Sequence, residues 1–133
     1  SEEIASFILP LGMTMNMDGT ALMQVVATIF IAGVAGYTVH LPPLILIGLL
    51  AVIASVGTPA APGAGAIILF TILSGVGFTN PIALSVYALI LAINRPIEML
   101  VTALNVTGDT ACAMVVCKSE NSLNEEVFNT VSK

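Results

Sequence analysis

Three acidic residues stand within segments that are otherwise apolar: Asp18, Glu98 and Asp109. A charged side chain in the interior of a bilayer costs about 2.5–3.5 kcal/mol on insertion scales, so it normally faces a polar cavity and serves a function. Arg95 can pair with Glu98 three residues later on a helix, which leaves Asp18 and Asp109 unpaired. A small hard cation or a proton can neutralise these carboxylates. Neighbouring asparagine side chains and exposed carbonyls would complete the oxygen ligands that such a cation prefers.

The composition places these acids in a membrane protein. The chain has 133 residues, of which 57% are hydrophobic and 8% are charged, and its mean hydropathy is +1.05. No Lys, Arg, Asp or Glu occurs between Asp18 and Arg95, a run that a surface in contact with water would not tolerate. We therefore expect contact with membrane lipid. The net charge of -5 is concentrated near the two ends, and a negative chain is not expected to have a nucleic-acid partner.

Asp18 lies where a long apolar stretch is interrupted. Residues 4–38 are long enough to cross a membrane. The sequence "NMDG" at 16–19 favours non-helical backbone, because Asn, Asp and Gly all disfavour a helix interior. We therefore predict a discontinuous transmembrane helix with an unwound joint near the middle of the membrane.

A second irregular stretch, "SVGTPAAPGAGA" at 55–66, lies between two short apolar runs, 44–54 and 67–76. Neither run is long enough to span a bilayer alone. Residues 43–77 are therefore predicted to form a re-entrant helical hairpin, whose tip must be buried in protein or line a cavity. A single kinked span is the competing interpretation.

Residues 81–117 are predicted to form one long amphipathic transmembrane helix. Its polar residues Glu98, Thr102, Asn105 and Asp109 follow spacings of four, three and four, so they share one helix face. Residues 119–133 are predicted to be a polar acidic tail. The predicted fold class is thus an all-α membrane protein.

Three motifs, in this order and at these intervals, carry a resemblance to a known family: "NMDGT" at 16–20, "SVGTPAAPGAGA" at 55–66 and "NVTGD" at 105–109. The chain resembles the C-terminal part of the dicarboxylate/amino acid:cation symporter family, also called the glutamate transporter family. Broken helices and re-entrant tips at a midplane binding site are typical of such secondary transporters.

The resemblance implies a multi-pass protein of the cell membrane that works as a secondary active transporter. Residues 1–118 would be the C-terminal half of a transport domain that moves like an elevator against a trimeric scaffold, with the tip at 55–65 as its gate. The chain begins without an initiating Met, and we expect the N-terminal scaffold and the first hairpin of the same protein to be missing from it. The complete protein would be a homotrimer.

The resemblance also implies three sodium sites, with a proton as the alternative coupling ion. One would use the carbonyls of Gly12, Asn16 and Asn105 with the Asp109 carboxylate. A second would join the Asn16 side chain to Asp18, completed by residues outside this chain. A third would form, mainly through backbone oxygens and only when the gate is shut, from the following residues: Thr14, Met17, Ser55, Val56 and Thr58.

For an amino-acid substrate, the family pattern places the α-carboxylate on Asn105 and the tip backbone, and the amino group on Glu98. The implied substrate-binding residues are Thr20, Val56, Gly57, Thr58, Pro62, Gly65, Glu98, Val101, Thr102 and Asn105. The sequence departs from the family pattern at two of them. Glu98 stands where amino-acid transporters of this type usually have Asp, and Val101 stands where transporters of acidic amino acids have Arg.

Valine cannot pair with a substrate carboxylate as arginine does, and an unpaired buried carboxylate costs several kcal/mol. A small neutral side chain would instead pack against Val101. We therefore expect sodium-coupled symport of a neutral amino acid, with an acidic amino acid or a dicarboxylate as the alternative. No enzyme activity is expected. An intramembrane aspartyl protease is a remote alternative, because Val106 replaces the first glycine of the GxGD signature.

Overall fold

The computed structural model describes residues 1–130, and within this range it contains helices and no strand. The elements are α1 (Glu2–Met15), α2 (Asp18–Val34), α3 (Leu41–Val56), α4 (Ala64–Val76), α5 (Pro81–Ile93), α6 (Arg95–Ser119) and α7 (Glu125–Thr130). Two stretches, Glu2–Val34 and Arg95–Ser119, are long and apolar enough to cross a membrane by length and composition. The predicted all-helical class is confirmed.

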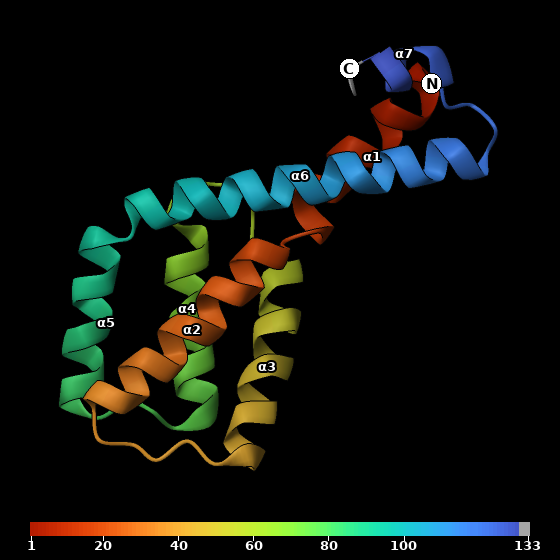
Figure 1. The fold of residues 1–133 in the computed structure, drawn as a ribbon. Helices are drawn as coiled ribbons and strands as arrows, with labels where there is room; N and C mark the ends of the chain where they lie inside the picture. The colour runs from red at the N-terminus through yellow and green to blue at the C-terminus, as the bar shows by residue number, and fades with distance from the viewer. Residues whose placement is uncertain (131–133) are drawn as a thin grey trace.

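The first long segment is broken where the sequence predicts it. Asn16 has φ -100° and ψ 81°, and Met17 has φ -114° and ψ 46°, so neither residue is helical. The two helices α1 and α2 are therefore separated by a two-residue non-helical joint (Figure 1). The discontinuous helix predicted for residues 4–38 is present.

A helical hairpin follows, formed by α3 and α4, which pack against each other and run in opposite directions (Figure 1). Pro42 and Pro43 lie in the first turn of α3, where a proline removes no helical hydrogen bond. Gly63 before α4 and Gly77 after it have φ of +85° and +78°, a conformation that favours glycine. The tip between the helices, residues 57–63, returns to the side of the molecule that holds the joint and α6.

The prediction of a single helix over 81–117 is wrong. Helix α5 ends at Ile93, and α6 starts at Arg95 in a steeply different direction (Figure 1). Pro96 explains the break, because it has no N–H to donate to the carbonyl of residue 92 and its ring would clash with that carbonyl. Helix α5 therefore packs on α2 and α4, whereas α6 packs on α1 and α2.

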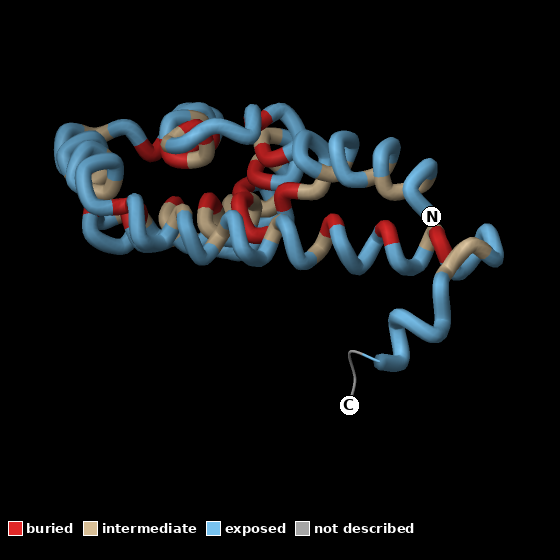
Figure 2. Tube along the Cα trace, turned by 90° about the horizontal axis from the view of Figure 1, so that it is seen from above, coloured by how far each residue is buried: buried red, intermediate tan, exposed pale blue. Residues whose placement is uncertain are grey.

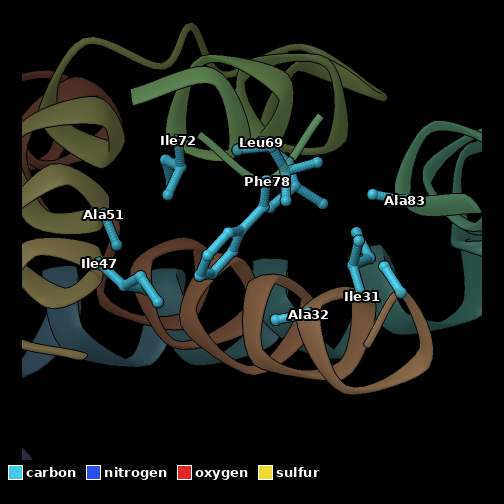
Figure 3. Close-up of a cluster of buried hydrophobic side chains, with 10 residues drawn as sticks. Ile31, Ala32, Ile47, Ala51, Leu69, Ile72, Phe78 and Ala83 are labelled. Atoms are coloured by element: carbon cyan, nitrogen blue, oxygen red, sulfur yellow. The ribbon is translucent and has the colours of Figure 1, made fainter. Parts of the chain in front are cut away.

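The apolar core lies between α2, α3, α4 and α5. Figure 3 shows its main side chains, which are Ile31, Ala32, Ile47, Ala51, Leu69, Ile72, Phe78 and Ala83. Buried residues occur in α2 to α6, and much of the remaining surface of the helices is exposed (Figure 2). Many of the exposed residues are large and apolar, for example Phe7, Ile53 and Met99. So many exposed apolar side chains suit contact with lipid or protein and not with water.

A polar clamp holds the base of the hairpin at the end opposite the tip. The Asn80 N–H donates to the Tyr37 hydroxyl at 3.0 Å, and the Asn80 side chain donates to the Ala35 carbonyl at 3.0 Å. The Tyr37 ring also stacks on Phe78, with 4.5 Å between the ring centroids. The clamp therefore ties the loop after α2 to the loop after α4.

The predicted polar tail, residues 119–133, includes the short exposed helix α7. The ammonium of Lys118 lies 3.8 Å from the carboxylate of Glu125, and both side chains are largely exposed. Residues 131–133 of the predicted tail lie outside the described residues.

Candidate functional site

A cleft of about 580 Å³ lies between α2, the hairpin tip and α6. Eight of the ten residues that the sequence assigns to substrate binding line it: Thr20, Thr58, Pro62, Gly65, Glu98, Val101, Thr102 and Asn105. The other two, Val56 and Gly57, are exposed residues that do not line it. Segments far apart in the sequence thus meet around one space that is large enough for an amino acid.

Asn16, in the joint, connects the broken helix to α6. Its side-chain amide donates to a carboxylate oxygen of Asp109 at 2.8 Å and to the backbone carbonyl of Asn105 at 3.2 Å. Both partners lie on the polar face of α6 that the sequence predicts. The non-helical backbone at Asn16 and Met17 places this side chain against α6.

Asn105 fixes the start of α2 against α6. Its side-chain oxygen accepts the Gly19 N–H at 2.9 Å, and its amide donates to the Thr20 hydroxyl at 3.1 Å and to the Met17 sulfur at 3.2 Å. Since the first N–H groups of a helix have no partner within the helix, this contact satisfies one of them. Asn105 and Thr20 therefore reach the cleft already oriented.

Three glycines allow this close approach of the helices. A Cβ atom on Gly12 would lie 2.5 Å from a carboxylate oxygen of Asp109, and one on Gly108 would lie 2.5 Å from the Asn16 amide nitrogen. A Cβ on Gly19 would lie 2.8 Å from the Val101 carbonyl oxygen. The absence of side chains at these positions therefore lets α1, the joint and the start of α2 lie directly against α6.

Asp109 is the buried acid of the site, with 4% of its surface exposed. Within residues 1–130 the salt bridges between side chains are Arg95–Glu98 and Lys118–Glu125, so no basic side chain pairs with Asp109. The Asp109 carboxylate and the Asn105 carbonyl both accept from the Asn16 amide, so one charged and one neutral oxygen lie around it. Oxygen ligands with a single negative charge suit a monovalent hard cation such as sodium. No group of three His, Cys, Asp or Glu side chains gathers in the described part of the chain, so the donor set does not suit a zinc-type site.

The structure does not bury Asp18. This side chain is exposed and forms no hydrogen bond or ion pair with any of residues 1–130. Asp18 is the first residue of α2, and it lies on a face that none of the described helices covers. The site predicted to join Asp18 to the Asn16 side chain was expected to be completed by residues outside this chain, so it stays a prediction.

The residues assigned to the gate-dependent sodium site are only partly assembled. Met17 and Thr58 line the cleft, but Thr14 and Val56 are exposed and do not. The hydroxyls of Thr14, Ser55 and Thr58 each donate to a carbonyl three or four residues earlier, at 3.0, 2.9 and 2.8 Å. Within the described residues, no hydrogen bond joins α1 to the tip, so this third site stays a prediction.

Sequence reasoning missed Gln24, which ties the second arm of the hairpin to α2. This side chain is fully buried, and its amide donates to the Gly65 carbonyl at 3.2 Å. Its other polar atom, Oε1, has no hydrogen-bond partner among the described residues. The spacing of four from Thr20 and four to Thr28 could have indicated a buried polar face here. Arg95, for which the sequence predicts only a pair with Glu98, also lines the cleft.

Comparison with known proteins shows the family of this chain. The sequence profile of the sodium:dicarboxylate symporter family matches residues 1–119. The chain belongs to this family of membrane transporters. That assignment confirms the predicted family and membrane localisation, agrees with sodium as the coupling ion of the family, and rules out the protease alternative.

Several excitatory amino acid transporters are similar to this chain. Excitatory amino acid transporter 5 of Homo sapiens is 38% identical over 121 residues, which are 88% of this chain and 21% of that protein. Excitatory amino acid transporter 4 of Mus musculus is 40% identical over 114 residues, 85% of this chain and 19% of that protein. An excitatory amino acid transporter of Caenorhabditis elegans is 35% identical over 113 residues, which are 85% of this chain and 22% of that protein. The chain spans about a fifth of the length of these relatives.

Proposed function

We propose that the full-length protein is a sodium-coupled symporter of an amino acid and that residues 1–118 form the C-terminal half of its transport domain. The observation that carries the proposal is the environment of Asp109. This buried acid has no basic partner within residues 1–130, contacts the non-helical joint through Asn16, and lines the same cleft as Asn105 and the tip. A sodium ion would offset the charge that the protein leaves uncompensated.

The cleft has the groups that a zwitterionic substrate needs. Thr20, Thr102 and Asn105 supply neutral hydrogen-bonding groups, and Glu98 supplies a carboxylate for an ammonium group. Gly63 and Gly65, at the N-terminus of α4, border the cleft. Because the N-terminal end of a helix favours negative charge, this side of the cleft suits the α-carboxylate.

Ion and substrate would be coupled through groups that the two ligands share. Asn105 contributes a carbonyl next to Asn16 and Asp109, and its side chain contacts Thr20 at the cleft. Sodium bound at the joint would therefore order the residues that receive the substrate. The tip at 55–65 would close over both ligands as the gate, and the closed domain would move as an elevator within a homotrimer.

Val101 favours a neutral side chain in the substrate. It lines the cleft, and the cleft contains one basic residue, Arg95, which already pairs with Glu98 within the described chain. An acidic side chain next to Val101 would lose its hydration without gaining a partner. Alanine, serine or threonine would meet valine without this cost.

An acidic amino acid or a dicarboxylate is the second candidate substrate. The relatives are named excitatory amino acid transporters, and the name of the family includes dicarboxylates as substrates. Arg95 supports this candidate because its cation lines the cleft. In that case Arg95 would take the role of the arginine that residue 101 lacks.

Uptake into proteoliposomes containing the full-length protein tests both candidates. We expect an inward sodium gradient to drive accumulation of alanine or serine more strongly than aspartate, and a choline gradient to drive none. Strong aspartate uptake with alanine and serine ignored would reverse the substrate assignment. Equal uptake with choline would contradict sodium coupling.

A further inference from the structure

The cleft contains an ion pair between Arg95 and Glu98. The Arg95 Nη1 atom lies 3.3 Å from Glu98 Oε2, and both residues line the cleft. The Glu98 side chain is 17% exposed, whereas the Arg95 side chain is 65% exposed. The Glu98 carboxylate is thus held inside the cleft, whereas the Arg95 guanidinium is largely exposed to solvent.

The position of this pair on α6 follows from helix geometry. Side chains on a helix tilt toward its N-terminus, so Glu98 leans back toward Arg95, which starts α6 three residues earlier. The same tilt takes the Glu98 carboxylate away from Asn105 and Asp109, which lie further along the helix. An aspartate at this position would be one methylene shorter and would reach Arg95 less well.

We propose that Arg95 occupies the amino-group site on Glu98 while the cleft is empty, so that the ammonium group of a substrate must displace it. The inference rests on the proposed function, since it assumes that Glu98 receives the amino group. Guanidinium and ammonium are both cationic donors, and they compete for the same carboxylate oxygens. Arg95 is then a specificity-determining residue that penalises any ligand without an ammonium group to replace it.

The exposure of Arg95 decides how strong this competition is. An ion pair with one largely exposed partner is weak, and the displaced guanidinium regains water at little cost. Removing the competitor should therefore tighten amino-acid binding modestly, by about 1.5- to 5-fold in Kd. Keeping a cation at residue 95 should preserve most of the competition.

Isothermal titration of the full-length protein with L-alanine in sodium chloride tests the inference. We expect Arg95→Gln to lower the Kd for alanine and Arg95→Lys to stay near the wild-type value. Lys118→Gln is the matched control, since it removes an exposed cation from the same helix outside the cleft. It should leave the Kd unchanged. An unchanged or higher Kd for Arg95→Gln would overturn the inference.

A double-mutant cycle separates the ion pair from other effects of the substitution. Glu98→Asp keeps the carboxylate but shortens its reach toward Arg95, so Arg95→Gln should have much less effect on the alanine Kd in that background than in the wild type. An equal effect in both backgrounds would show that the pair with Glu98 is not the cause.

The wild-type titration separates the two proposals. If the wild type binds alanine only with sodium and Arg95→Gln does not tighten binding, the displacement inference fails and the proposed function stands. If the wild type binds no alanine in sodium chloride, the proposed neutral-amino-acid function fails and the inference falls with it.

Discussion

At the scale of single residues, the buried carboxylate of Asp109 determines which ligand this site can take. Among residues 1–130, its one hydrogen bond from a side chain comes from the neutral amide of Asn16, which does not cancel a charge. A protein keeps such a group when an ion neutralises it, because the uncompensated charge costs several kcal/mol. Asp109 is therefore the residue whose change should affect sodium most directly.

Replacing Asp109 by Asn removes the charge and keeps the size of the side chain. We expect the affinity for sodium to fall by about 10- to 100-fold, since hydrogen bonds and contacts to charged groups are worth about 1.5–3 kcal/mol. Without sodium, the variant should melt at or above the wild-type temperature because an uncompensated buried charge is gone. Thermal melts of the full-length protein across a sodium titration measure both effects.

The matched control is Glu120→Gln, which removes an exposed acid just beyond α6. It should leave the sodium titration unchanged. A sodium-induced shift in melting temperature that is equal in Asp109→Asn and in the wild type would exclude Asp109 as a sodium ligand.

Val101 makes a separate prediction about the substrate. An arginine at position 101 would offer a bidentate partner for a side-chain carboxylate, so Val101→Arg should raise the ratio of aspartate uptake to alanine uptake at least about tenfold, as charged pairs in dry sites allow. Val101→Leu keeps the site apolar and should retain the preference for alanine. Competitive uptake with both amino acids gives the ratio, and no change in Val101→Arg would mean that residue 101 does not face the substrate side chain.

At the scale of the elements, the site depends on how closely α1 and α6 approach each other. The contact is tight where Gly12 meets Asp109. Open space surrounds Gly33 in α2, where an added Cβ would meet nothing within 4 Å. The two glycines therefore form a matched pair for testing the helix contact.

Gly12→Ala should destabilise the protein by about 1–3 kcal/mol, as overpacking of close contacts does, and should also weaken sodium binding because the carboxylate must shift. Gly33→Ala should stabilise the protein by about 0.5–1 kcal/mol, since alanine loses less entropy in a helix. Melting temperatures in detergent, with and without sodium, compare the two variants. Equal stability of Gly12→Ala and Gly33→Ala would contradict the close packing of α1 on α6.

The sequence predicts the broken helix and the hairpin because both depend on local chemistry. Asn, Asp and Gly interrupt a helix wherever they cluster. Prolines and glycines likewise end the two helices of the hairpin, whatever surrounds them in the fold. The polar face of α6 is likewise a matter of spacing alone. These features needed no knowledge of the rest of the molecule.

Other features could not be predicted in this way. The break at Asn94 depends on a proline inside an apolar run, and such a run is also compatible with a kinked continuous helix. The exposure of Asp18 and the burial of Gln24 depend on which helices cover each face of α2. Burial is a tertiary property, so residue type alone did not distinguish these two polar side chains.

At the scale of the whole molecule, one cleft joins three distant parts of the chain: the joint with the start of α2, the hairpin tip, and α6. The base of the hairpin is held by the Asn80 and Tyr37 clamp, while Gly65 near the tip packs on Thr20 and Met23 of α2. The proposed ion and substrate sites therefore lie between elements that come together only when the chain folds. Binding of the ion and the substrate should stabilise the protein jointly.

The most direct measurement is a thermal melt of the full-length protein under four conditions, with sodium or choline chloride at equal ionic strength and with or without alanine. We expect alanine to raise the melting temperature in sodium chloride, by the equivalent of about 2.7 kcal/mol at 100 times its Kd, and to have no effect in choline chloride. An equal rise in both salts would show that amino-acid binding does not need sodium and would contradict the joint site.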